Sequence, residues 1–181
     1  GPAASLAFTT GPSAAVAGAA NTPAIVVHAL DSNGLLATTF TGNVTLAIGA
    51  NPGGSTLGGT VTVAAAAGVA TFPGITLNKT GAGYTLIASS GTLTAGTSAA
   101  FNISAAAASA LAITAGNAQS GSPGATLPTP LAVKVTDAFG NAVPGQNVTF
   151  TITTGGGTFG AATSTTVATD ASGQATAVWT L

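Results

Sequence analysis

Very few side chains in this sequence could do chemistry. The acidic residues are Asp31, Asp137 and Asp170, the basic residues are Lys79 and Lys134, and His28 is the lone histidine. General acid–base catalysis and zinc binding need clusters of His, Cys, Asp or Glu. Because the chain has no cysteine and no glutamate, we expect no enzyme activity, no catalytic residue and no cofactor.

Each aspartate begins a D-x-x-G sequence, at positions 31–34, 137–140 and 170–173. An aspartate in this position accepts hydrogen bonds from the backbone that follows it, and the glycine adopts a positive φ. We therefore predict three structural Asx turns. The functional alternative is a calcium ion bound by Asp137 and Asp170 at a joint between domains. Calcium takes about six to eight oxygen ligands, of which two carboxylates supply few.

His28 and Lys134 occupy the same position in two similar stretches of sequence. An unpaired lysine is rarely buried, so the strand face that carries both residues should be exposed to solvent. On the opposite face, Val27 is expected in the core. Metal binding by His28 is the alternative, but the chain has no second histidine or cysteine to act as a co-ligand.

Composition also limits the partners that the chain could bind. A formal net charge of -1, with no arginine, leaves no basic patch for nucleic acid. Polar residues and glycine interrupt every apolar stretch before it reaches about 18 residues, so we expect no membrane insertion. Neither class of partner is therefore predicted.

The elements that carry these residues show a period of two. Val148, Phe150 and Ile152 share one face of a run in which Thr149 and Thr151 share the other. Such alternation is typical of a strand with one buried and one solvated face. The polyalanine runs at 64–67 and 105–108 are too short to form a helix. The sequence therefore predicts an all-β protein.

The strand pattern occurs twice. Residues 24–48 read AIVVHALDSNGLLATTFTGNVTLAI, and residues 130–152, about 105 positions later, read PLAVKVTDAFGNAVPGQNVTFTI. About 100 residues suits a seven-stranded immunoglobulin-like β-sandwich. We predict two tandem domains of this kind, one at 1–104 and one at 105–181, with a linker at 105–110.

Turn sequences rich in Gly, Asn and Pro delimit the expected strands. These lie near 6–9, 24–30, 42–48, 60–65, 68–77, 83–89 and 97–103 in the first domain, and near 111–114, 131–136, 146–153, 164–169 and 173–181 in the second. The second domain lacks a counterpart of the last two strands of the first, which would leave a core face and a sheet edge open. Either the chain is cut from a longer array or strands of a neighbouring chain complete the domain. We favour the first, because no spare strand pair precedes Leu6.

Two motifs of the second copy are similar to a known family. P-L-A-V-K-V-T-D-A-F-G-N-A-V-P-G-Q-N-V-T-F and T-D-A-S-G-Q-A-T-A make residues 111–181 resemble the bacterial immunoglobulin-like group 1 modules of invasin and intimin type. Residues 5–104 resemble related repeats of very large bacterial surface and secreted proteins, through D-S-N-G, G-V-A-T-F and G-Y-T-L-I-A-S-S-G. The resemblance implies stalks, spacers or adhesive tips outside the cell, and some such modules accompany secreted glycan-active enzymes.

Several residues are expected to be structural. Tyr84 stands where sandwiches place a tyrosine corner, whose hydroxyl bonds nearby backbone, and Leu46 and Leu86 are expected in the core. Trp179 should lie on the inward face of the last strand, where its N–H needs a partner that the missing strands could supply. Stacking of a sugar on Tyr84 or Trp179 is the alternative.

These observations predict a structural or adhesive repeat module of a long bacterial extracellular protein, whose main partners are neighbouring repeats of the same chain. We expect Lys79 to face the second domain and to pair with Asp137 or Asp170. Cell-surface and glycan ligands stay open as partners. One alternative is a carbohydrate-binding accessory module, which needs exposed, coplanar aromatic rings. The other is a filament subunit completed by strands from a neighbouring chain.

Overall fold

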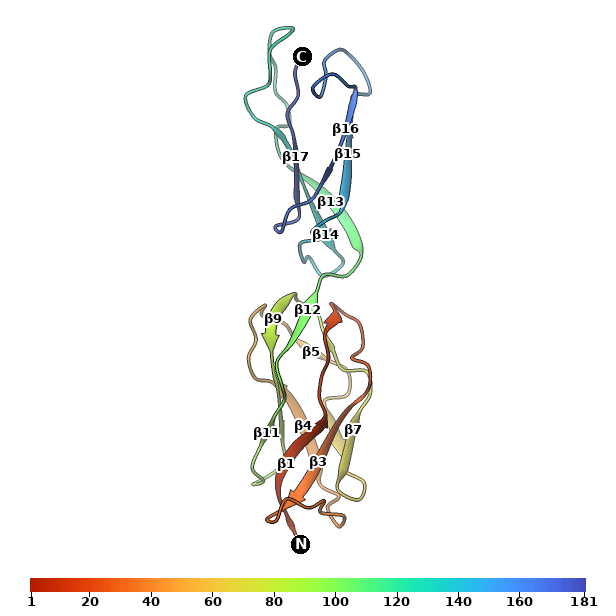
Figure 1. Cartoon of the computed structure of the whole chain (residues 1–181), viewed down its shortest axis with the longest axis vertical. Helices are drawn as coiled ribbons and strands as arrows, with labels where there is room; N and C mark the ends of the chain where they lie inside the picture. Colours follow the sequence, from red (N-terminus) through yellow and green to blue (C-terminus); the bar gives the residue numbers. More distant parts are fainter. The chain divides into compact units, whose positions relative to one another are not determined.

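The computed structural model describes residues 1–181 and consists of strands, turns and loops (Figure 1). The chain is all-β, as the sequence predicts, and forms several sheets. It divides into two compact units, which we name unit 1 (Gly1–Ser104) and unit 2 (Ala105–Leu181). No helix of the chain has the length and apolar character needed to cross a bilayer.

Unit 1 contains four sheets, with strand orders β1-β3-β7, β11-β10-β4-β6, β2-β12-β9 and β5-β8, and each contributes residues to its core. This arrangement is compatible with an immunoglobulin-like sandwich. The strands are β1 (Ala3–Thr10), β2 (Ala15–Val16), β3 (Ile25–Asp31), β4 (Asn43–Ile48), β5 (Leu57–Gly58), β6 (Thr62–Ala64), β7 (Val69–Phe72), β8 (Thr76–Leu77), β9 (Gly81–Tyr84), β10 (Leu86–Ser89), β11 (Gly96–Thr97) and β12 (Phe101–Ser104).

The core of unit 1 follows the predicted alternation. Every second residue of β3 is buried, from Ile25 to Asp31, and the residues between them are half-buried. Val27, Leu46 and Leu86 are at most 2 % exposed, which confirms them as core residues. His28 lies on the other face of β3, as predicted, but it is half-buried rather than fully exposed because β1 and β7 flank it in the sheet.

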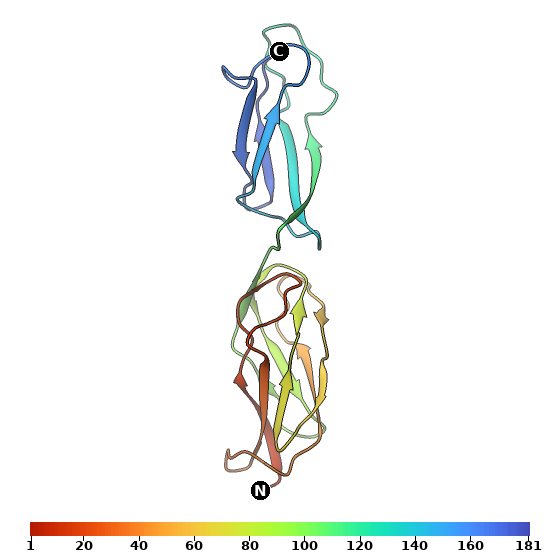
Figure 2. The same ribbon diagram turned by 90° about the vertical axis from the view of Figure 1, so that its right-hand side faces the viewer.

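Unit 2 has fewer strands, arranged in a sheet of order β13-β14-β17 and a separate pair, β15-β16 (Figure 2). The strands are β13 (Ala108–Ala115), β14 (Leu131–Asp137), β15 (Asn147–Thr151), β16 (Ser164–Ala168) and β17 (Gln174–Ala177). Its core cluster holds Val133, Val135, Val148 and Ala175, with three half-buried side chains, Val143, Phe150 and Val167, packed against it.

The two units repeat the same strand register. His28 pairs with Ala7 and Val69 across β1 and β7, and the exposed Lys134 pairs with Ala112 and Gln174 across β13 and β17. A threonine pair also recurs. The hydroxyls of Thr45 and Thr62 are 2.9 Å apart in unit 1, and those of Thr149 and Thr166 are 2.8 Å apart in unit 2. The sequence repeat is thus a repeat of backbone pairing.

Some element boundaries differ from the sequence-based prediction. β13 begins at Ala108, so half of the predicted linker at 105–110 is strand. The strand predicted at 68–77 is broken by a turn in which Gly74 has a φ of 74°. β17 ends at Ala177, so Trp179 lies beyond it and not on a regular strand face. The two-residue strands β2 and β5 were not predicted, because so short an element has no period.

Candidate functional site

The three aspartates form the predicted Asx turns. In each case one carboxylate oxygen, Oδ1, accepts backbone N–H bonds from the residues two and four positions later, at 2.8–3.0 Å. The backbone N–H of the glycine three positions later donates to the aspartate carbonyl oxygen at 3.0 Å. These glycines have φ values of 75–78°, which favour glycine over any L-residue. The D-x-x-G sequence is therefore sufficient to specify this local structure.

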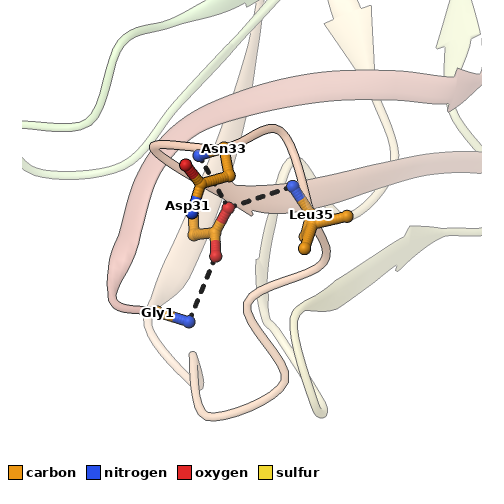
Figure 3. Close-up of polar contacts among 4 residues, drawn as sticks. All are labelled: Gly1, Asp31, Asn33 and Leu35. Carbon is orange, nitrogen blue, oxygen red and sulfur yellow. Dashed lines mark hydrogen bonds and ion pairs between the residues drawn. The ribbon is translucent and has the colours of Figure 1, made fainter.

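Two of these carboxylates also hold the beginning of their unit. The Oδ2 atom of Asp31 lies 3.1 Å from the amino group of Gly1, while its Oδ1 accepts from Asn33 and Leu35 (Figure 3). In unit 2 the Oδ2 atom of Asp137 accepts the backbone N–H of Ala106 at 3.0 Å. We name this arrangement the carboxylate clasp. It fixes the entry of the chain beside the turn that follows β3 or β14.

Asp137 carries the more complete set of bonds. Its Oδ2 also accepts a hydrogen bond from the Asn141 side-chain amide at 2.8 Å, so that the carboxylate accepts four in all. Four is about the number of lone-pair positions that a carboxylate offers. The side chain is 3 % exposed. Coordination of calcium by Asp137 would have to displace some of these bonds.

The hydrogen bonds lower the pKa of all three carboxyl groups and so favour their ionised form. Burial raises the pKa of Asp137, but the bonds from Asn141, Ala106 and the turn backbone outweigh it and the net pKa is lowered. The N–H of Leu35 is the largest cause of the lowered pKa of Asp31. The hydroxyl of Ser172 does the same for the pKa of Asp170, whose carboxylate is exposed. No three His, Cys, Asp or Glu side chains gather into a group that could hold a metal ion.

Tyr84 makes the hydrogen bond expected of a tyrosine corner. Its hydroxyl donates to the carbonyl oxygen of Lys79 at 2.9 Å, and its ring, 5.9 Å from that of Phe101, is fully buried. A sugar therefore has no access to this ring. Lys79 belongs to unit 1 and the aspartates Asp137 and Asp170 to unit 2, and the ion pair between them stays a prediction.

Trp179 has a buried N–H without an acceptor. Its indole Nε1 is inaccessible to solvent and makes no hydrogen bond, although the residue as a whole is half-buried. Its ring centroid lies 6.5 Å from that of Phe159, which in turn is 6.3 Å from Phe150, and both pairs are tilted. A buried polar group without a partner costs about 1–3 kcal/mol. The sequence indicated that the indole N–H needs a hydrogen-bond partner, but it did not indicate where in the fold Trp179 lies.

An apolar groove runs beside Trp179 in unit 2. One pocket of about 270 Å³ lies between β13, β14 and β15, where Ile113, Phe150 and Trp179 contribute to its walls. A second pocket of about 350 Å³, in which polar and apolar groups contribute about equally to the walls, lies between Leu111 of β13 and Val148 of β15. We name these two pockets together the β13–β15 groove. The only sign of it in the sequence is the lack of counterparts to β9–β12.

No protein-family model matches the chain, and no curated protein matches it either. The side chains offer hydrogen-bonded turns, an apolar groove and one unpaired indole N–H. We base the functional proposals on these features.

Proposed function

We propose that the chain is a structural or adhesive repeat module of a long bacterial extracellular protein, in which it acts as a stalk, spacer or surface-presentation unit. The observation that carries the proposal is the parallel pairing between the N-terminal strands of unit 1 and the C-terminal part of that unit. β2 and β12 run parallel, with Ala15 opposite Ile103 and Val16 opposite Ser104. A stalk transmits tension, and this pairing determines how the unit responds to it.

A second parallel contact lies in β1, next to Thr94, which precedes β11. Leu6 donates its backbone N–H to the carbonyl oxygen of Thr94, and Thr94 donates to that of Ala4, both at 2.9 Å. When parallel strands are pulled from opposite ends, they slide along each other, and their hydrogen bonds share the load. Antiparallel terminal strands would open one bond at a time. The geometry therefore favours resistance to extension.

Two further observations support a repeat module. The carboxylate clasp and the threonine pair recur in both units with the same register. The motifs at 130–150 and 169–177 resemble those of bacterial immunoglobulin-like modules, which supports an extracellular setting. Stacked modules of this kind give length, because each contacts mainly its neighbours.

Single-molecule pulling on the full chain through its two ends tests the proposal. We expect unit 1 to unfold in one high-force step and Thr94→Pro, which removes the N–H donated to Ala4, to lower that force. Ser32→Pro is the matched control, because the position after Asp31 in the turn accepts proline. An unchanged force in the Thr94 variant would contradict the load-sharing argument.

A panel of glycans separates the proposal from the carbohydrate-binding alternative. That alternative predicts saturable binding that changes the fluorescence of Trp179, the single tryptophan of the chain. A spacer predicts no such response. Saturable glycan binding that is lost in Trp179→Ala, but not in Phe139→Ala, would favour the accessory module.

A further inference from the structure

Two strands of unit 2 have an open edge where the equivalent strands of unit 1 are bonded on both sides. In unit 1, β4 bonds β6 on one side and β10 on the other, and β1 bonds both β3 and Thr94. In unit 2, the equivalent β15 bonds only β16, and β13 bonds only β14. The strands that would complete it correspond to β9–β12 of unit 1, residues 81–104.

Exposure of equivalent side chains shows what this segment covers. Leu6 pairs with Ala29, and Leu111 occupies the same register position opposite Val135. Leu6 is 4 % exposed, whereas Leu111 is 55 % exposed. Ile113, the counterpart of the half-buried Phe8, is 64 % exposed. Unit 2 therefore exposes apolar residues whose counterparts in unit 1 are buried or half-buried.

The backbone of β15 is arranged to accept another strand. Thr169 donates its N–H to the carbonyl oxygen of Gln146, and Ile152 donates to Thr163, so the even-numbered residues bond towards β16. Hydrogen-bonded positions alternate in an antiparallel pair. The N–H and C=O groups of Asn147, Thr149 and Thr151 are thus directed to the open edge. In unit 1 the equivalent positions, 43, 45 and 47, include those that pair with Ser89 and Ile87 of β10.

The β13–β15 groove lies between these two open edges, and the Trp179 side chain lines one part of it. An apolar groove alone does not identify what fills it. Here unit 1 provides the template, because the same strands, in the same register, are covered there by β9–β12, in which β10 pairs with β4 and buries small and aliphatic residues. Leu86 and Ala88 of β10 are both 0 % exposed.

We propose that unit 2 binds an extended polypeptide segment of the β9–β12 type, which adds to β15 as an antiparallel strand and fills the β13–β15 groove. By the register of unit 1, the position of Ala88 lies opposite Phe150 and the position of Leu86 opposite Ile152. Backbone bonds to the strand edge provide affinity and the alternating apolar side chains provide selectivity. The inference does not depend on the proposed spacer function.

Titration of the full chain with a synthetic peptide of residues 81–104 tests this inference. The chain has one tryptophan, at 179, and the peptide has none, so tryptophan emission reports on the groove alone. We expect a saturable blue shift as the peptide excludes water from the groove. A matched peptide with Leu86→Asn and Ala88→Asn should produce no saturable shift, because its inward positions are polar.

Variants of β15 provide a second test of the inference. Thr151→Pro removes an N–H that is directed to the open edge and not to β16, a position where strands tolerate proline. We expect it to weaken peptide binding by about tenfold or more, while Thr151→Ser binds as the wild type does. The inference is overturned by the absence of a saturable shift with the wild-type chain or by equal binding of both variants. It is also overturned if a second copy occupies the groove, seen as dimerisation that Thr151→Pro abolishes and the peptide does not displace.

Discussion

Asp137 and Asp170 occupy the same sequence motif, but replacing each by asparagine should have different effects on the stability of unit 2. Both begin a D-x-x-G turn in unit 2, and both have a lowered pKa. The difference is the second carboxylate oxygen. At Asp137 it accepts the N–H of Ala106 and the side-chain amide of Asn141, whereas at Asp170 all three bonds go to Oδ1, from Ser172 and Gln174.

The expected magnitude follows from these bonds. Asparagine has one carbonyl oxygen, so the Asp137→Asn side chain keeps one pair of bonds and presents its NH₂ group to the other two donors. Hydrogen bonds to a charged group contribute about 1.5–3 kcal/mol each. Loss of both should lower the free energy of unfolding of unit 2 by about 3–6 kcal/mol. In Asp170→Asn the NH₂ group takes the solvent-facing position, and we expect little change.

The assay follows the fluorescence of the single tryptophan of the chain. Trp179 is the only tryptophan and lies in unit 2, so its fluorescence during urea unfolding of the full chain reports on that unit separately. The Asp137 variant should shift the urea midpoint strongly and the Asp170 variant should not. Equal shifts in the two variants would refute the clasp as a stabilising contact, and a larger shift in the Asp170 variant would reverse the assignment.

Three further outcomes follow from the structure. Leu86→Ala should lower the stability of unit 1 by about 2–5 kcal/mol, because the side chain is fully buried, whereas His28→Ala should lower it by about 0.5 kcal/mol. Tyrosine fluorescence from Tyr84 during urea unfolding measures both losses. Losses of similar size in the two variants would show that the core assignment is wrong. Tyr84→Phe should cost about 1–2 kcal/mol through the lost bond to Lys79, read by circular dichroism during thermal unfolding, with no change expected if the bond contributes nothing. In the folded chain the pKa of each aspartate is below its ordinary value of 3.8. The stability that the ionised carboxylates contribute is therefore fully present above pH 3.8, and it is lost as the pH falls through the pKa values of the folded state. Urea midpoints measured from neutral to acidic pH should be level and then drop, and a drop that begins near neutrality would contradict this sign.

Local patterns in the sequence predicted the fold class and the turns. Alternation placed Val27, Leu46 and Leu86 in the core, and each D-x-x-G sequence specified its own Asx turn, because the atoms that bond are within four residues. The clasp was not predicted. The group that Asp137 holds is a backbone N–H from Ala106, and backbone donors have no signature in the sequence.

The position of Trp179 shows the second kind of limit. Alternation extended the last strand to residue 181, but β17 ends at Ala177 because the following residues pair with two loops, through Thr126 and Thr158, instead of with β14. Pairing with distant loops depends on the tertiary fold and not on local period. The β13–β15 groove is unpredictable from local pattern for the same reason, since it depends on which edges remain unpaired.

The exposed fractions of the side chains at the open edge also determine how tightly the added segment should bind to unit 2. Full burial of a leucine or isoleucine side chain contributes about 1.5–3 kcal/mol, and Leu111 and Ile113 are each more than half exposed. Their burial therefore contributes on the order of 2–3 kcal/mol, to which edge hydrogen bonds add and from which the ordering of a flexible peptide subtracts. A separate peptide should consequently bind weakly, and its titration needs to reach about a millimolar. The same segment held close to unit 2 would bind at a high effective concentration, so covalent attachment should raise occupancy of the groove without any new contact.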